Sequence, residues 1–155
     1  MDKKLKVLFL SRGSASRSHM AEGFLRTLAG DLFVPSSAGT ESAGVSSLAR
    51  EVMSEVGIDI SSQKPSEVAS LFRDTFHCVV SLCDEPRERY PLFPFTRRLL
   101  RWSVPDPEVV SGGTEVGKQA FRQVRDQLRN RVEELIETMN QRSSEVPVAY
   151  AAAGR

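Results

Sequence analysis

Apolar residues in this chain occur in short unbroken runs that alternate with longer stretches of helical periodicity. The runs predict strands at 5–10, 32–34, 76–82 and 99–104. Apolar positions that recur every three or four residues predict helices at about 20–30, 46–57 and 121–139, and a further helix is predicted to begin at 64–67. Strands that alternate with helices are typical of an α/β sandwich with a mostly parallel sheet.

The sequence also predicts helix ends and buried faces. The first helix should end near Gly30 and bury the face that carries Met20, Phe24, Leu25 and Leu28. The second helix has Ser46 or Ser47 as its N-cap and Gly57 as its stop. The last helix has a charged outer face, which we interpret as solvated, and its pattern ends at about 142. This predicts one domain over 1–142 and a loose tail over 143–155.

Length and charge narrow the class of protein. A chain of 155 residues can bury a core without disulfides, and its net charge of +1 implies no general attraction to nucleic acid or membranes. Its first apolar run is too short for a signal peptide or a membrane span. Two cysteines in such a chain are more often free thiols than a structural disulfide. We therefore expect a soluble cytoplasmic protein.

Candidate chemistry is concentrated between the first strand and the first helix. A tight loop of small residues at this point can direct several backbone N–H groups at one anion. Arg17 adds a guanidinium at the start of the helix, where a positive charge needs a compensating anion. A bound oxyanion would supply that charge, and an acid such as Glu22 is the alternative partner. The predicted oxyanion-binding residues are Ser11, Arg12, Gly13, Ser14, Ala15, Ser16 and Arg17.

Two further loops follow predicted strands. One begins after Cys83, and the other is the segment 105–107, which contains Asp106. Ligands of parallel sheets bind at the carboxyl ends of the strands. We therefore expect these two loops to converge with the loop at 11–17 on one site.

The segment 11–18 resembles the anion loop of the low-molecular-weight protein tyrosine phosphatase family, most closely in its thioredoxin-coupled arsenate reductase branch. That loop is a cysteine, five residues, an arginine and usually a serine, followed by a helix that begins near Met-Ala-Glu-Gly. Arg17-Ser18 and Met20-Ala21-Glu22-Gly23 match the pattern, whereas Ser11 stands at the position of the cysteine. Other similar segments are Ser37-Ala38-Gly39-Thr40-Glu41, Cys83-Asp84-Glu85, Trp102-Ser103 and Asp106-Pro107. The resemblance spans about residues 4–140 and implies a three-layer sandwich with a four-stranded parallel sheet.

The resemblance also implies catalytic roles, which fall on Ser11, Arg17, Asp106 and Cys83. In the family the loop cysteine attacks the oxyanion and an aspartate before a proline is the general acid, a position that Asp106 matches. Arsenate reduction uses two further cysteines and then thioredoxin. Cys83 matches the first of these, but Tyr90 stands where the other is expected. The alternative for Asp106, which lies between two prolines, is that it shapes a turn, and the alternative for Cys83, a lone cysteine at a strand end, is that it is a packing residue.

Ser11 decides how much chemistry remains. A loop that stabilises the thiolate of a cysteine, whose pKa is about 8.5, cannot deprotonate an alcohol, so Ser11 would need a general base. His19 is the only histidine near the loop in the sequence, and a solvent-facing position on the helix is its simpler interpretation. Ser14 and Ala15 also differ from the family's usual Asn-Ser, which favours natural divergence over an engineered Ser11.

No cofactor and no metal is predicted. Glu22 and Ser37 are similar to members of a cation site in the arsenate reductase branch. Ser14 replaces an asparagine of that site, so we do not expect bound potassium. Cys78, on a predicted strand, is interpreted as a core residue.

Three functions are compatible with the sequence. The first is an oxyanion-binding protein with impaired thiol chemistry, whose ligand is phosphate, arsenate or a phosphoprotein. The second is an active arsenate reductase or phosphatase that uses Ser11 or Cys83, with thioredoxin as a possible partner. The third is a non-catalytic interaction module that works through its long last helix. The weak nucleophilicity of Ser11 favours the first.

Overall fold

The computed structural model describes residues 4–11, 16–39, 46–63, 66–67, 75–83, 98–109 and 113–143. The strands are β1 (Leu5–Ser11), β2 (Phe33–Gly39), β3 (Ser66–Glu67), β4 (Cys78–Cys83) and β5 (Leu99–Ser103). The helices are α1 (Ser16–Ala29), α2 (Ser47–Ser54) and α3 (Thr114–Ser143), and a 3₁₀ turn, η2, covers Pro107–Val109. Apart from Ser143, the predicted tail lies outside the described residues.

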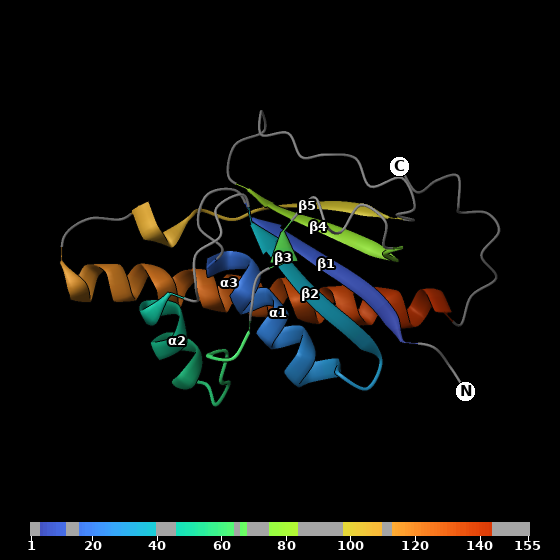
Figure 1. Ribbon diagram of the computed structural model, residues 1–155, viewed down its shortest axis with the longest axis horizontal. Helices are drawn as coiled ribbons and strands as arrows, with labels where there is room; N and C mark the ends of the chain where they lie inside the picture. The colour runs from blue at the N-terminus through green and yellow to red at the C-terminus, as the bar shows by residue number, and fades with distance from the viewer. Residues whose placement is uncertain are drawn as a thin grey trace.

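All described strand pairs are parallel, in the order β3-β2-β1-β4-β5. Four strands of five to seven residues form the body of the sheet, and β3 adds two residues at one edge (Figure 1). This confirms the predicted α/β class and its four-stranded parallel sheet. Ser11 pairs with Leu82, which in turn pairs with Trp102, so the carboxyl ends of β1, β4 and β5 share one edge.

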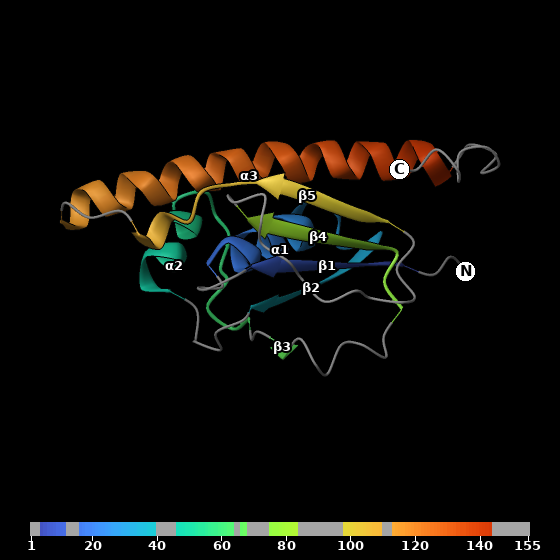
Figure 2. The ribbon, with the colours of Figure 1, turned by 90° about the horizontal axis from the view of Figure 1, so that it is seen from above.

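The described helices pack on one face of this sheet. Alternate residues of β1 point to opposite faces: Val7 and Phe9 belong to the larger core with the helices, whereas Leu8 and Leu10 belong to a smaller cluster with Phe76. Figure 2 shows α3 beside β5 and the short β3 at the opposite edge. The described residues place no helix on the face that carries Leu8 and Leu10, so they do not test the second helical layer of the predicted three-layer sandwich. No helix in the described ranges is long and apolar enough to cross a membrane.

Three local predictions were wrong in detail. The strand predicted at 32–34 continues as β2 to Gly39, because its polar residues pair in register with β1 as far as Ser11. The helix predicted to begin at 64–67 is replaced at Ser66–Glu67 by β3, which pairs with the end of β2. Leu28 was placed on the buried face of α1 but is 40% exposed.

The predicted ends of α2 were confirmed. Ser46 is its N-cap and accepts a hydrogen bond from the Ala49 backbone N–H at 3.4 Å. Gly57 follows the helix with φ of +82°, a conformation that other residues adopt only at a cost. The choice between Ser46 and Ser47 is thereby settled in favour of Ser46.

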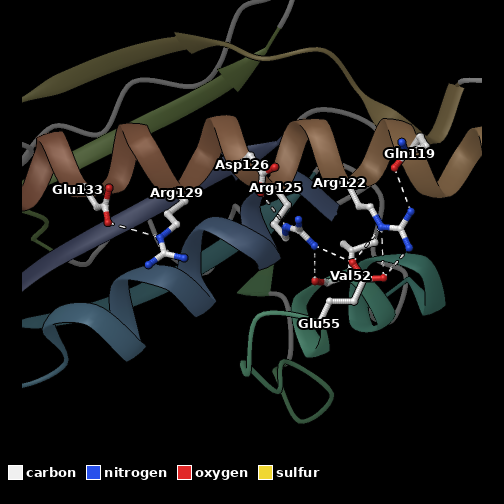
Figure 3. A network of polar contacts seen from close by, with 8 residues as sticks. All are labelled: Val52, Glu55, Gln119, Arg122, Arg125, Asp126, Arg129 and Glu133. Atoms are coloured by element: carbon white, nitrogen blue, oxygen red, sulfur yellow. Dashed lines mark hydrogen bonds and ion pairs between the residues drawn. The ribbon is translucent and has the colours of Figure 1, made fainter.

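A cluster of ion pairs and hydrogen bonds joins the C-terminal end of α2 to α3 (Figure 3). The Glu55 carboxylate accepts hydrogen bonds from Arg122 and Arg125, at 2.7 Å and 2.8 Å. Arg125 also donates to the Val52 carbonyl at 2.9 Å, which satisfies an acceptor near the C-terminal end of α2. The Arg122 hydrogen bond is the main reason that the pKa of Glu55 is lowered to about 2.

This shift predicts an acid-sensitive contribution of Glu55 to stability. Because the folded-state pKa is lowered, the contribution is present above the unfolded value of about 4.5 and is lost as pH falls toward 2. We expect Glu55→Gln to lower the free energy of unfolding at pH 7 and to differ less and less from the unaltered protein below pH 4.5. Urea unfolding at several pH values measures this. Glu133→Gln, which breaks an exposed pair within α3, is the control. A Glu55→Gln effect that stayed constant down to pH 3 would contradict the prediction.

Candidate functional site

The first component of the site joins the end of β1 to the start of α1. Ser11, the last residue of β1, is fully buried, and its Oγ accepts a hydrogen bond from the Ser18 backbone N–H at 2.9 Å. Ser18 is the third residue of α1, so its N–H has no acceptor within the helix. Ser11 therefore stabilises the helix start at the position that the resemblance gives to a nucleophile. The neighbouring residues 12–15 lie outside the described part of the chain.

The second component is Arg17, whose side chain is only 2% exposed. Its Nη1 donates to the Val104 carbonyl at 2.9 Å, and its Nη2 lies 3.9 Å from Asp106 Oδ2. A guanidinium this deeply buried is costly unless it is paired and hydrogen-bonded. These contacts hold the segment after β5 against the start of α1. Arg17 thus joins the start of α1 to the segment that carries Asp106, whereas the loop after Cys83, which was predicted to converge with them, lies outside the described residues.

The third component, Glu108, was missed in the sequence analysis. Glu108 lies in η2, and its carboxylate accepts a hydrogen bond from the hydroxyl of Ser16, the first residue of α1. Its backbone N–H donates to Asp106 Oδ1 at 3.0 Å. A signal was available, because the first turn of α1 carries no acidic residue although the positive end of a helix favours one. An acid from another segment was therefore to be expected.

His19 is fully buried, so the solvent-facing interpretation is wrong. Burial lowers the pKa of His19, because the charged imidazolium loses solvation. Neither ring nitrogen has a hydrogen-bond partner among the described residues. The His19 backbone carbonyl accepts a hydrogen bond from Gln63 Nε2 at 2.8 Å. His19 is therefore a buried residue of α1, and among the described residues its ring makes no hydrogen bond to Ser11.

Glu22, the alternative partner of Arg17, belongs to a separate polar cluster. Its carboxylate accepts hydrogen bonds from Ser37 Oγ, at 2.6 Å, and from Arg26. Arg26 also donates to Gln63 Oε1 at 2.5 Å. Burial raises the pKa of Glu22, and the Ser37 and Arg26 contacts oppose that shift. The Glu22 carboxylate, which the resemblance places in a cation site, is thus paired with Arg26 in this structure.

The two cysteines differ in position. Cys78 begins β4, is buried, and has its pKa raised to about 12 by burial, so it is an unreactive core thiol as predicted. Cys83 ends β4 and pairs in register with Ser103 of β5. Its backbone is therefore at the same edge of the sheet as Ser11. Tyr90 lies outside the described residues.

The sheet, the buried arginine at the start of α1 and the carboxylate beside it define a class of α/β proteins with a parallel sheet and a buried cation at the first turn of the first helix. Within this class, residues 6–145 match the low molecular weight phosphotyrosine protein phosphatase family. The chain belongs to that family.

Several proteins similar to this chain are arsenate reductases. The enzyme of Bacillus subtilis is 36% identical over 138 residues, which are 89% of this chain and 99% of the relative. A glutaredoxin arsenate reductase of Synechocystis is 36% identical and matches 84% of this chain and 95% of its own. A solved arsenate reductase in the phosphate binding state superimposes with a TM-score of 0.74 at 34% identity, covering 86% of this chain and 98% of that one.

Proposed function

We propose that this protein binds a tetrahedral oxyanion, phosphate or arsenate, at residues 11–17, and that its thiol chemistry is impaired because Ser11 stands at the nucleophile position. The observation that carries the proposal is the placement of Arg17. Its buried guanidinium comes from the first turn of α1 and lies 3.9 Å from Asp106, and the same turn is hydrogen-bonded to Ser11 at the end of β1 through the Ser18 N–H. An anion bound here can accept hydrogen bonds from the guanidinium and from the backbone N–H groups at the helix N-terminus.

The relatives support the choice of ligand. An arsenate reductase of similar fold has been solved in a phosphate binding state, and the residues that match the family, 6–145, include the whole segment 11–17. A thiol-redox partner such as thioredoxin would need the three-cysteine relay, of which Ser11 and Tyr90 occupy two positions. We therefore propose oxyanion binding without thioredoxin coupling. A reducing compartment suits the free Cys78 thiol, and we place the protein in the cytoplasm.

The impairment follows from the environment of Ser11. Its buried Oγ accepts a hydrogen bond from Ser18, and no described carboxylate or imidazole is hydrogen-bonded to it as a base. General base catalysis contributes roughly 10²–10⁴-fold, so a serine that lacks it turns over slowly. Catalysis by Ser11 or Cys83 and a purely interacting role remain the competing functions.

Loss of phosphate binding in Arg17→Ala tests the proposal. We expect calorimetric titration to show binding of inorganic phosphate to the unaltered protein and none to Arg17→Ala, because the charge-assisted contacts are lost. Arg17→Lys keeps the charge but not the planar fork, and should bind about tenfold more weakly. Because Arg17→Lys keeps the buried positive charge, it tests the site even if Arg17→Ala does not fold.

Arg129→Ala is the matched control, because Arg129 is a half-exposed arginine on α3. It should bind phosphate like the unaltered protein. Equal phosphate affinity in all four proteins would contradict the proposed site. Absence of binding to the unaltered protein would favour the interaction module instead.

A further inference from the structure

The start of α1 is in contact with a carboxylate from η2, that of Glu108, to which the resemblance gave no role. Glu108 accepts a hydrogen bond from Ser16 Oγ, and Ser16 is a buried residue that directly precedes Arg17. The carboxylate of Glu108 therefore lies at the rim of the proposed oxyanion site. Asp106, whose Oδ1 accepts the Glu108 N–H at 3.0 Å, fixes the backbone that carries it.

A carboxylate in this place changes which anions the site can hold. An ionised carboxylate only accepts hydrogen bonds, and its two oxygens have room for about four, so the Ser16 hydroxyl leaves acceptor capacity. An oxyanion that carries a proton can donate to this carboxylate. An oxyanion without a proton is repelled by the negative charge of the carboxylate and cannot donate a hydrogen bond that would compensate for this repulsion.

Common tetrahedral anions differ at neutral pH in whether they carry a proton. Inorganic phosphate and arsenate keep at least one proton. Sulfate has none, and phosphate monoesters, with a second pKa of about 6, are mostly fully ionised. A carboxylate at this position would thus favour inorganic phosphate and arsenate over sulfate and over the phosphorylated side chains of proteins.

We infer that Glu108 is a specificity-determining residue, which restricts the proposed oxyanion site to proton-bearing inorganic anions, phosphate and arsenate. The inference rests on the proposed function, since it concerns the same site. It deepens that function by disfavouring a phosphoprotein as the ligand.

The test compares inorganic phosphate, sulfate and phenyl phosphate by calorimetric titration at pH 7.5. The unaltered protein should bind phosphate at least tenfold more tightly than either of the other two anions. Glu108→Gln keeps an oxygen acceptor for Ser16 but removes the charge. We expect the ratio of phosphate to sulfate affinity to fall roughly tenfold in this variant, mainly through tighter sulfate binding, which is the size of a like-charge penalty in a partly screened site.

Glu133→Gln is the matched control, because it makes the same change on the outer surface of α3, where Glu133 pairs with Arg129. It should leave the ratio unchanged. Phosphate binding that depends on Arg17, with a ratio that Glu108→Gln does not move, would overturn this inference alone. Absence of phosphate binding to the unaltered protein would overturn the proposed function and this inference together.

Discussion

Ser11→Cys is expected to hydrolyse phenyl phosphate at least about 10²-fold faster than the unaltered protein. The first turn of α1 and the Ser18 N–H, 2.9 Å from Ser11 Oγ, would stabilise a thiolate at this position. A thiolate needs no general base, whose absence costs the serine roughly 10²–10⁴-fold. The thiolate would attack phosphorus, and an S–P bond would form as the P–O bond to the phenyl group breaks. Asp106 would protonate the departing phenolate, and water would then hydrolyse the thiophosphate.

The double variant Ser11→Cys, Arg17→Ala is the control for this gain. It should lose the gained activity, because Arg17 is needed to hold the phosphoryl group. Steady-state release of phenol measures all three proteins. Arsenate reduction with thioredoxin should stay undetectable in Ser11→Cys, because Tyr90 still interrupts the relay. Hydrolysis by the unaltered protein at a rate that Ser11→Ala abolishes would show instead that Ser11 is itself a working nucleophile.

Local patterns in the sequence predicted those elements whose conformation is determined by residues close together in the chain. The apolar run of β1, the capping serine of α2 and the three- and four-residue steps of α3 each stabilise their element directly. The polar second half of β2 was missed because its strand conformation comes from pairing with β1, which no local pattern records. Ser66–Glu67 became a strand for the same reason, since the end of β2 supplied its partner.

The site shows the same division between local and distant signals. Ser11 and Arg17 were found because they stand six positions apart, within one strand–loop–helix segment. Glu108 was missed because its contact with Ser16 joins residues 92 positions apart. His19 was placed on the wrong side of α1, because a polar residue type predicts exposure more often than burial. Distant contacts such as these become visible only when the strands are placed side by side.

The largest stability effect is expected at Phe9, in the centre of the sheet. Phe9 is fully buried, and its ring centroid lies 5.9 Å from that of Trp102 at an angle of 47°. Phe9→Ala should lower the free energy of unfolding by about 3–5 kcal/mol, because the lost ring leaves a cavity that rigid strands on both sides cannot fill. A domain of this size is stable by about 5–15 kcal/mol, so the variant should be close to unfolding. Urea denaturation followed by Trp102 fluorescence measures the change.

Two further variants separate the cavity from a general loss of apolar surface. Phe9→Leu keeps an apolar side chain of smaller volume and should cost clearly less than Phe9→Ala. Leu99→Ala, at a side chain that is 63% exposed, should change the free energy of unfolding by less than about 0.5 kcal/mol. Phe9 lies two residues before Ser11, and Trp102 lies two residues before Val104, whose carbonyl accepts from Arg17. The contact between the two rings therefore stabilises the ends of β1 and β5, which lead into the site. Similar losses in Phe9→Ala and Leu99→Ala would show that this pair does not stabilise the site.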